Sequence, residues 1–158
     1  MILVADCSAL VALSICDSLH LLEALFTRVA VPESVYLEAT KPDKHQAQAL
    51  KHFLQGKVHQ VDLRNYVFLD AFADAGETEA MVLYKQLSAD KLLIDDRRGR
   101  KVAKINQIDT IGSLGILLAA KAKGLVTEVK PLLSQIEQSD IYLSSSLIAT
   151  VLELAGES

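Results

Sequence analysis

Acidic residues in this sequence recur directly after short apolar runs and near the ends of short amphipathic segments. The acids placed in this way are Asp6, Glu38, Glu77, Glu79, Asp95 and Asp96. Carboxylates gathered at one place repel each other unless a cation neutralises them, and oxygen ligands favour hard divalent ions such as Mg²⁺ or Mn²⁺. Such ions bind a phosphodiester and activate a water molecule that attacks it. The acids therefore indicate metal-dependent phosphodiester hydrolysis, provided that the fold brings them together.

Basic residues follow the last of these acids without a gap. Arg97, Arg98, Arg100 and Lys101 come immediately after Asp96. A guanidinium group binds phosphate oxygens in pairs, and an ammonium group binds them as a point charge. Taken alone, the cluster fits a solvated helix face equally well. Beside a metal site, it is suited to hold the phosphate backbone of a nucleic acid.

The elements that would position these residues alternate along the chain. Predicted strands lie at 1–5, 28–31, 91–94 and 109–111, and 58–63 is a candidate edge strand or hairpin. Predicted helices lie at 7–26, 32–40, 45–56, 74–88, 97–106 and 113–124, and near 129–138 and 144–155, with Asp74 opening the fourth and Pro32 in the first turn of the second. This alternation predicts a three-layer α/β/α sandwich with a mostly parallel central sheet. The carboxyl ends of parallel strands share one edge, where the acids would meet.

The overall composition narrows the class of protein. A chain of 158 residues suits one domain, predicted over 1–158 with a helical tail at 129–158. The net charge of −4 argues against a strongly basic nucleic-acid binder, but an acidic metal site can produce that total in a nuclease. The apolar runs are too short for a signal peptide or for a bilayer span of ~20 residues. With no disulfide pattern in its two cysteines, a soluble cytoplasmic protein is expected.

Ordinary structural roles compete with several of these assignments. Glu77 and Glu79, considered singly, suit the first turn of a helix, where the helix dipole favours acids. Glu38 alone suits a solvated helix face. Three histidines are spaced by seven residues, but no acid or cysteine nearby completes a zinc site. The stretch at 112–115 fits a phosphate-binding turn, although a plain turn and helix cap is the commoner use of such residues.

Four segments, in order along the chain, resemble the motifs of the PIN domain, the fold of VapC-type toxin nucleases. The segments are VADCSALVAL at 4–13, VPESVYLEA at 31–39, AGETEAMVL at 75–83 and LLIDDRRGRKVA at 92–103. The segment at 108–126 and the tail after it resemble a prokaryotic PIN-like subfamily that is often encoded beside a small antitoxin. The resemblance covers nearly the whole chain and implies a PIN-like sandwich.

Carried onto this sequence residue by residue, the resemblance implies a set of catalytic and metal-binding acids. The matching positions are Asp6, Glu38, either Glu77 or Glu79, and Asp96, with Asp95 beside it. Ser8 would assist these acids from the turn after the first strand. Glu79 suits the usual spacing of an acid followed by alanine in the third motif. Glu77 suits the Gly-Glu form of the subfamily, so both stay open.

The resemblance also implies an activity and partners. It implies a Mg²⁺- or Mn²⁺-dependent ribonuclease that forms a homodimer and is inhibited by an antitoxin segment in the acidic groove. The alternative is a catalytically weak PIN-like module that binds RNA or a protein and regulates rather than cuts. Cleavage that requires metal, and that disappears in Asp6→Asn without loss of stability, would separate the two.

Overall fold

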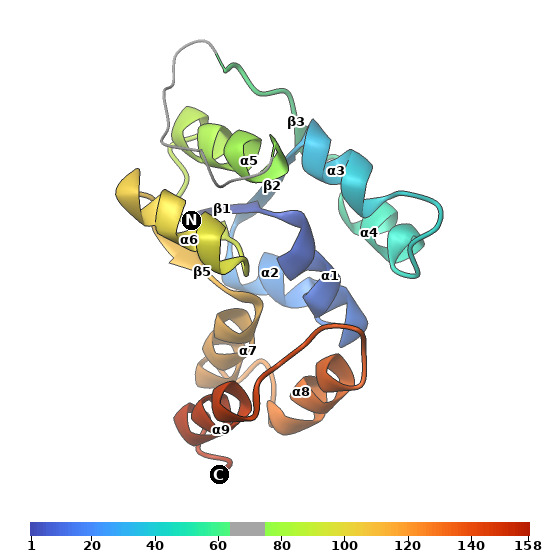
Figure 1. The fold of residues 1–158 in the computed structure, drawn as a ribbon, viewed down its shortest axis with the longest axis vertical. Helices are drawn as coiled ribbons and strands as arrows, with labels where there is room; N and C mark the ends of the chain where they lie inside the picture. Colours follow the sequence, from blue (N-terminus) through green and yellow to red (C-terminus); the bar gives the residue numbers. More distant parts are fainter. Residues whose placement is uncertain (64–74) are drawn as a thin grey trace.

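The sheet at the centre of the molecule consists of parallel strands. The structure, a computed structural model, describes residues 1–63 and 75–158 (Figure 1). The strands in these ranges are β1 (Ile2–Ala5), β2 (Arg28–Pro32), β3 (Val58–His59), β4 (Lys91–Leu93) and β5 (Thr110–Ile111). They lie in the order β3-β2-β1-β4-β5, and each neighbouring pair is parallel. The predicted α/β/α class is confirmed, and the sheet is more uniformly parallel than expected.

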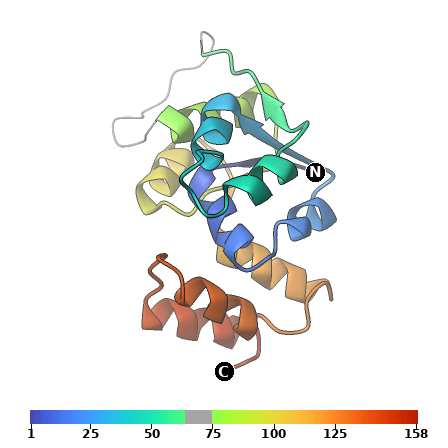
Figure 2. The same cartoon turned by 90° about the vertical axis from the view of Figure 1, so that its right-hand side faces the viewer.

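Helices cover both faces of this sheet. Within the described ranges they are α1 (Cys7–Ile15), α2 (His20–Leu25), α3 (Glu33–Ala39), α4 (Ala47–Phe53), α5 (Ala75–Gln86), α6 (Arg97–Ile105), α7 (Ser113–Ala122), α8 (Lys130–Glu137) and α9 (Ser145–Leu154). In two views at right angles, α7, α8 and α9 gather at one end of the molecule (Figures 1 and 2). None of the helices in the described ranges combines the length and apolar character needed to cross a bilayer.

The strands are continuous in apolar residues because both faces of the sheet are buried. Leu3, Ala5 and Leu93 belong to a core shared with α1, α2 and the C-terminal helices. Val4 and Leu92, which point the other way, belong to a second core shared with α5 and α6. Alternate side chains of a strand face opposite sides, so a strand between two helical layers must be apolar at every position.

The segment 7–26, predicted to be helical, forms two helices with a break between them. Asp17 has a φ of 55°, in the left-handed region, and interrupts the helix after Cys16. The Ser18 N–H donates to the Leu13 carbonyl at 2.8 Å, which closes the turn. Aspartate tolerates this conformation better than most residues. The apolar residues on both sides of the break hid it in the sequence.

Two smaller boundaries also differ from expectation, and a third lies outside the described residues. Within the described residues, the segment 58–63 contributes the edge strand β3, Val58–His59, parallel to β2, which confirms the edge alternative with a shorter strand. Pro32 is the last residue of β2 and the N-cap of α3, with extended backbone angles, rather than part of the first turn. Asp74, predicted to open the helix before Glu77, lies outside the described residues, and α5 is described from Ala75.

The C-terminal helices occur where the tail was expected, and they pack on α1 and α7. Leu133, Ile136 and Val151 are buried in the first core. The segment between α8 and α9 runs back toward α1 and the loop between α3 and α4, and its Ile141 packs against this core. The tail therefore forms one wall of two hollows described below, both of which Ile141 lines.

Candidate active site

Asp6 lies at the point where the strand order of the sheet reverses. The chain places β2 and β3 on one side of β1, and β4 and β5 on the other. Ala5 pairs with Leu93, and the Asp6 N–H donates to the Leu93 carbonyl at 2.8 Å. Asp6 is only 5% exposed. In open parallel sheets, ligands bind at the carboxyl ends of the strands beside such a reversal.

The side chains of Glu77 and Asp96 both lie against Gly99, in the first turn of α6. Asp96 is the N-cap of this helix, and its Oδ2 accepts a hydrogen bond from the Gly99 N–H at 2.7 Å. Glu77 is buried in the first turn of α5, and its Oε2 lies 2.9 Å from the place that a Cβ on Gly99 would take. That Cβ would also meet Ile94 Cδ1 at 2.6 Å. The missing side chain therefore lets the α5 carboxylate approach α6.

The structure separates the two candidates for the third acid. Glu79 is half-buried and lines a different hollow, together with Glu33 and Ser34 of α3. Residues two apart on a helix do not face the same way, so only one of the pair can face α6. Of the two, Glu77 is the one that lies beside Gly99, whose N–H is bound by Asp96.

Asp95 holds the start of α7. Its Oδ1 accepts a hydrogen bond from the Ser113 N–H, and its Oδ2 accepts one from the Ser113 hydroxyl, both at 2.7 Å. Ser113 is buried, and Gly112 before it leaves room for the carboxylate, whose Oδ1 would lie 3.0 Å from a Cβ at that position. The turn at 112–115 is thus a helix start that receives a carboxylate from the protein itself.

Asp95 also faces a hollow of about 310 Å³, here called the acidic hollow. Its lining consists of Cys7, Ser8, Val11, Glu38, Lys44, Asp95 and Ile141. The Ser8 side chain is exposed there, and Glu38 reaches the hollow from the last turn of α3. Three of the residues singled out in the sequence therefore share one space.

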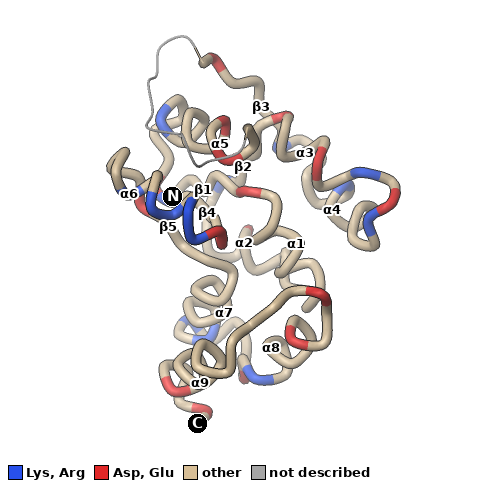
Figure 3. The backbone as a smooth tube through the Cα atoms, viewed as in Figure 1, with Lys and Arg blue, Asp and Glu red and all other residues tan. Residues whose placement is uncertain are grey.

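A second, larger hollow of about 640 Å³ lies on the other side of Asp95 and is here called the basic hollow. Arg97, Arg100, Lys101 and Lys104 contribute its positive charges, and Asp95 and Asp109 its negative ones. Arg98 is exposed on α6 but is not part of this lining. Lysine and arginine concentrate along α6, beside the acidic positions at its start (Figure 3).

The comparison with protein families agrees with this arrangement. The model of the family DUF3368, a PIN domain, matches residues 2–157. This chain belongs to that PIN-domain family. No curated protein matches the sequence. PIN domains are generally nucleases that typically use divalent metal ions, so the fold of this chain is of a nuclease type.

The acids of this PIN domain suit a hard metal ion in chemistry, although their side chains are not gathered into one site. Within residues 1–63 and 75–158, no group of three or more His, Cys, Asp or Glu side chains lies close enough to hold a metal ion. Instead, Glu77 and Asp96 each lie against Gly99, and Glu38 and Asp95 each line the acidic hollow. The donors are all carboxylate oxygens, which Mg²⁺ and Mn²⁺ prefer. The side chains would have to close around the ion.

Three residues of the PIN domain site escaped the sequence analysis. Ser113 binds Asp95, and only the position of a serine at a helix start hinted at such a role. Lys104 follows Arg97, Arg100 and Lys101 at helical spacing, which is a signal that the sequence did contain. Lys44 lies in a loop, and loop residues follow no periodic pattern from which their position could be predicted.

Proposed function

We propose that this PIN domain is a Mg²⁺- or Mn²⁺-dependent endoribonuclease. The observation that supports the proposal most directly is the position of two buried acids, Asp6 at the strand-order reversal and Glu77 against the first turn of the cationic helix α6. Carboxylates next to phosphate-binding cations are what hydrolysis of a polyanion requires.

In this proposal Asp6, Glu38, Glu77 and Asp96 hold the metal ion. When bound, the ion supplies positive charge to the phosphodiester and lowers the pKa of a water molecule. Asp95 acts through Ser113, because its two hydrogen bonds fix the start of α7 relative to β4. Ser8 offers a hydroxyl at the mouth of the acidic hollow.

The cations of α6 hold the RNA backbone in this scheme. Arg97, Arg100 and Lys101 line the basic hollow, and Asp95 borders both hollows. A phosphate bound in the basic hollow would therefore lie next to the acids. Arg98, exposed on the same helix, would add to the positive field that attracts RNA.

The decisive experiment measures cleavage and melting together. Wild-type protein should cut single-stranded RNA with Mg²⁺ or Mn²⁺ and stop when EDTA removes the ion. Metal at about 100 times its Kd should raise stability by about 2.7 kcal/mol, or roughly 5–10 °C in Tm for a chain of this size. Asp6→Asn should lose cleavage and the metal response, while its Tm in EDTA is unchanged or higher.

A second function has an observation in its favour. The acids are dispersed among the described residues, as expected for a PIN-like module that binds RNA or a protein without cutting. RNA binding without cleavage, together with a Tm that ignores metal, would establish that function and contradict the nuclease.

We further propose that the protein is the toxin of a toxin–antitoxin pair and acts as a homodimer. The resemblance of the 108–126 segment to a toxin subfamily supports the first idea. Exposed apolar side chains on the C-terminal segment, Tyr142 and Leu154 among them, support the second. Induced expression in a bacterial host should then stop growth, and the same Asp6→Asn exchange should restore it. Light scattering of the purified protein gives its oligomeric state.

A further inference from the structure

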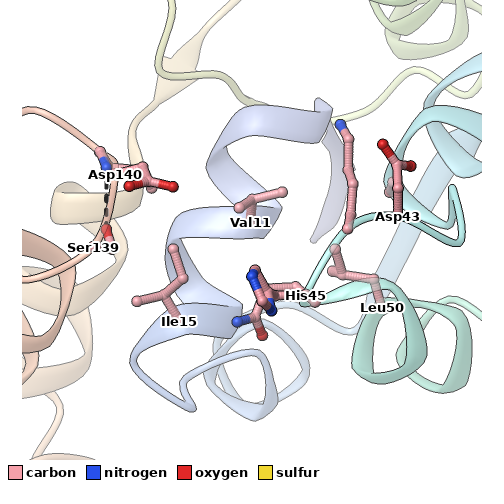
Figure 4. Close-up of a pocket in the computed structure, with 11 residues that line it drawn as sticks. Val11, Ile15, Asp43, His45, Leu50, Ser139 and Asp140 are labelled. Atoms are coloured by element: carbon pink, nitrogen blue, oxygen red, sulfur yellow. Dashed lines mark hydrogen bonds between the residues drawn. The ribbon is translucent and has the colours of Figure 1, made fainter.

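A pocket of about 490 Å³ lies beside the acidic hollow and has no role in the reaction proposed above. Its apolar lining includes Val11 and Ile15 from α1 and Leu50 from α4 (Figure 4). Ile141, between α8 and α9, lines it as well. The volume lies within the range of about 300–1,000 Å³ that is usual for small-molecule sites. The pocket is large enough for a flat heterocycle.

The rim of this pocket is polar and carries two carboxylates. Asp43 and His45 come from the loop before α4, and Asp140 comes from the opposite side, between α8 and α9 (Figure 4). Local hydrogen bonds fix both sides, since the Ser14 hydroxyl donates to Gln46 Oε1 at 2.7 Å and the Ile141 N–H donates to Ser139 Oγ at 3.1 Å. Ionised carboxylates only accept hydrogen bonds, so the acids of the rim favour a ligand that donates.

The pocket continues into the acidic hollow. Val11, Lys44 and Ile141 line both spaces. Lys44 is half-buried at this junction, where its ammonium group can pair with a phosphate. Consider an RNA strand with a phosphate near the acids and its next base turned toward α1. The phosphate would contact the Lys44 ammonium group, and the base would enter the apolar pocket.

We propose that this pocket, called here the base pocket, holds one unstacked base of single-stranded RNA and prefers a base with an exocyclic amino group, such as cytosine, over uracil. The inference rests on the proposed nuclease function for the position of the phosphate. The amino group of cytosine donates to a carboxylate, whereas uracil presents a carbonyl oxygen at the same place and is repelled. Single-stranded RNA is usually read in this way, by contacts to splayed bases.

The test uses labelled uridine hexamers that carry one cytidine at each position in turn. Binding is measured by fluorescence anisotropy with the Asp6→Asn protein, so that cleavage does not interfere. One position should bind about three- to tenfold more tightly with cytidine than with uridine, the effect expected from one or two hydrogen bonds. The other positions should show little difference.

Variants of the acidic and the apolar lining residues test whether the preference for cytidine arises in this pocket. Asp43→Asn and Asp140→Asn should reduce it, because an amide can also donate to the uracil oxygen. Asp17→Asn, on an exposed turn outside the pocket, is the matched control. Ile15→Trp fills the apolar part of the pocket and should remove the preference, whereas Leu125→Trp, at an exposed position after α7, should not.

Three results would contradict the proposal that this pocket binds a base. One is equal affinity for every hexamer, and another is a cytidine preference that none of the pocket variants changes. The third is Ile15→Trp blocking a partner protein while leaving RNA binding intact, which would assign the pocket to that partner. A separate cleavage assay on the wild type keeps the two proposals apart, since RNA can be cut without base preference or bound with preference and not cut.

Discussion

Gly99 is the residue on which the approach of α5 to α6 depends. Its backbone is helical, so no unusual φ explains the glycine. The explanation is space, because Glu77 Oε2 and Ile94 Cδ1 fill the volume of a side chain. A buried glutamate in the first turn of one helix thus meets the first turn of another.

Replacement of Gly99 by alanine should disturb the site more than the fold. Alanine gains roughly 1 kcal/mol in helix propensity, while overpacking costs about 1–3 kcal/mol. The net loss of stability should be about 0–2 kcal/mol, measured by urea unfolding. Glu77 has to move, so the rise of Tm with Mg²⁺ or Mn²⁺ should shrink.

Gly115→Ala is the matched control for this exchange. Gly115 also lies in a helix, and its Cβ would meet only the Ile111 side chain, at 3.0 and 3.6 Å. Its metal response should equal that of the wild type. An equal loss in both variants would mean that Gly99 matters for packing alone.

For single residues, the sequence could identify candidate acids but not the side chains and backbone groups that surround them. Glu77 and Glu79 are equivalent in spacing arguments, and only burial and the neighbouring Gly99 distinguish them. Asp95 and Asp96 are adjacent and chemically identical, yet one binds Ser113 of α7 and the other caps α6. Such differences depend on contacts between distant segments, which no local pattern contains.

Among the helices, the last turn of the chain forms a clasp that joins α7, α8 and α9. Glu157 Oε2 accepts hydrogen bonds from Lys121 Nζ and the Val129 N–H, both at 2.8 Å, and its Oε1 accepts one from the Lys130 N–H at 2.9 Å. The carboxylate therefore satisfies amides at the start of α8, where the helix dipole also favours an acid.

This clasp predicts a pH dependence of stability. The hydrogen bond from Lys121, followed by the backbone bond from Val129, lowers the pKa of Glu157 from 4.5 to about 2. Because the pKa is lower in the folded state, the stabilisation is complete above about pH 4.5 and is lost as the pH falls toward 2. Glu157→Gln should therefore be less stable than the wild type at pH 7, with a difference that shrinks below pH 4.5.

Urea unfolding at several pH values measures this difference. Glu153→Gln, at an exposed position on α9, is the control and should leave stability unchanged at every pH. If Glu157→Gln behaves like the control, the clasp adds nothing to stability in solution.

The helical and strand segments were mostly predictable, since two-sided burial produces apolar runs and amphipathic periodicity marks the helices. The exceptions have physical reasons. The break at Asp17 lies between apolar residues that pack into the same core, so the pattern continues across it. The shortness of β3 reflects its place at the edge, where few neighbours impose a pattern on the sequence.

On the scale of the whole molecule, charge is unevenly distributed. The net charge is −4, yet α6 alone carries Arg97, Arg98, Arg100, Lys101 and Lys104. An acidic protein with one cationic helix can attract RNA to that helix and repel it elsewhere.

Salt dependence should locate the RNA backbone on this molecule. Each lost phosphate contact lowers the slope of log K against log salt by about 0.7 for a single strand. Lys101→Ala and Lys104→Ala should each show this change with every RNA sequence, because phosphates carry no sequence information. Lys123→Ala, exposed at the end of α7, should keep the slope of the wild type, and a change there as large as at Lys101 would contradict a localised path.

The wall of the base pocket that Asp140 and Ile141 form is synthesised after the sheet. Every strand and every candidate acid precedes it in the sequence, while the wall itself follows α8. A ribosome therefore completes the sheet and its acids before it adds the residues that enclose the base pocket. Selectivity for a base would thus be acquired later in synthesis than the acids of the candidate active site.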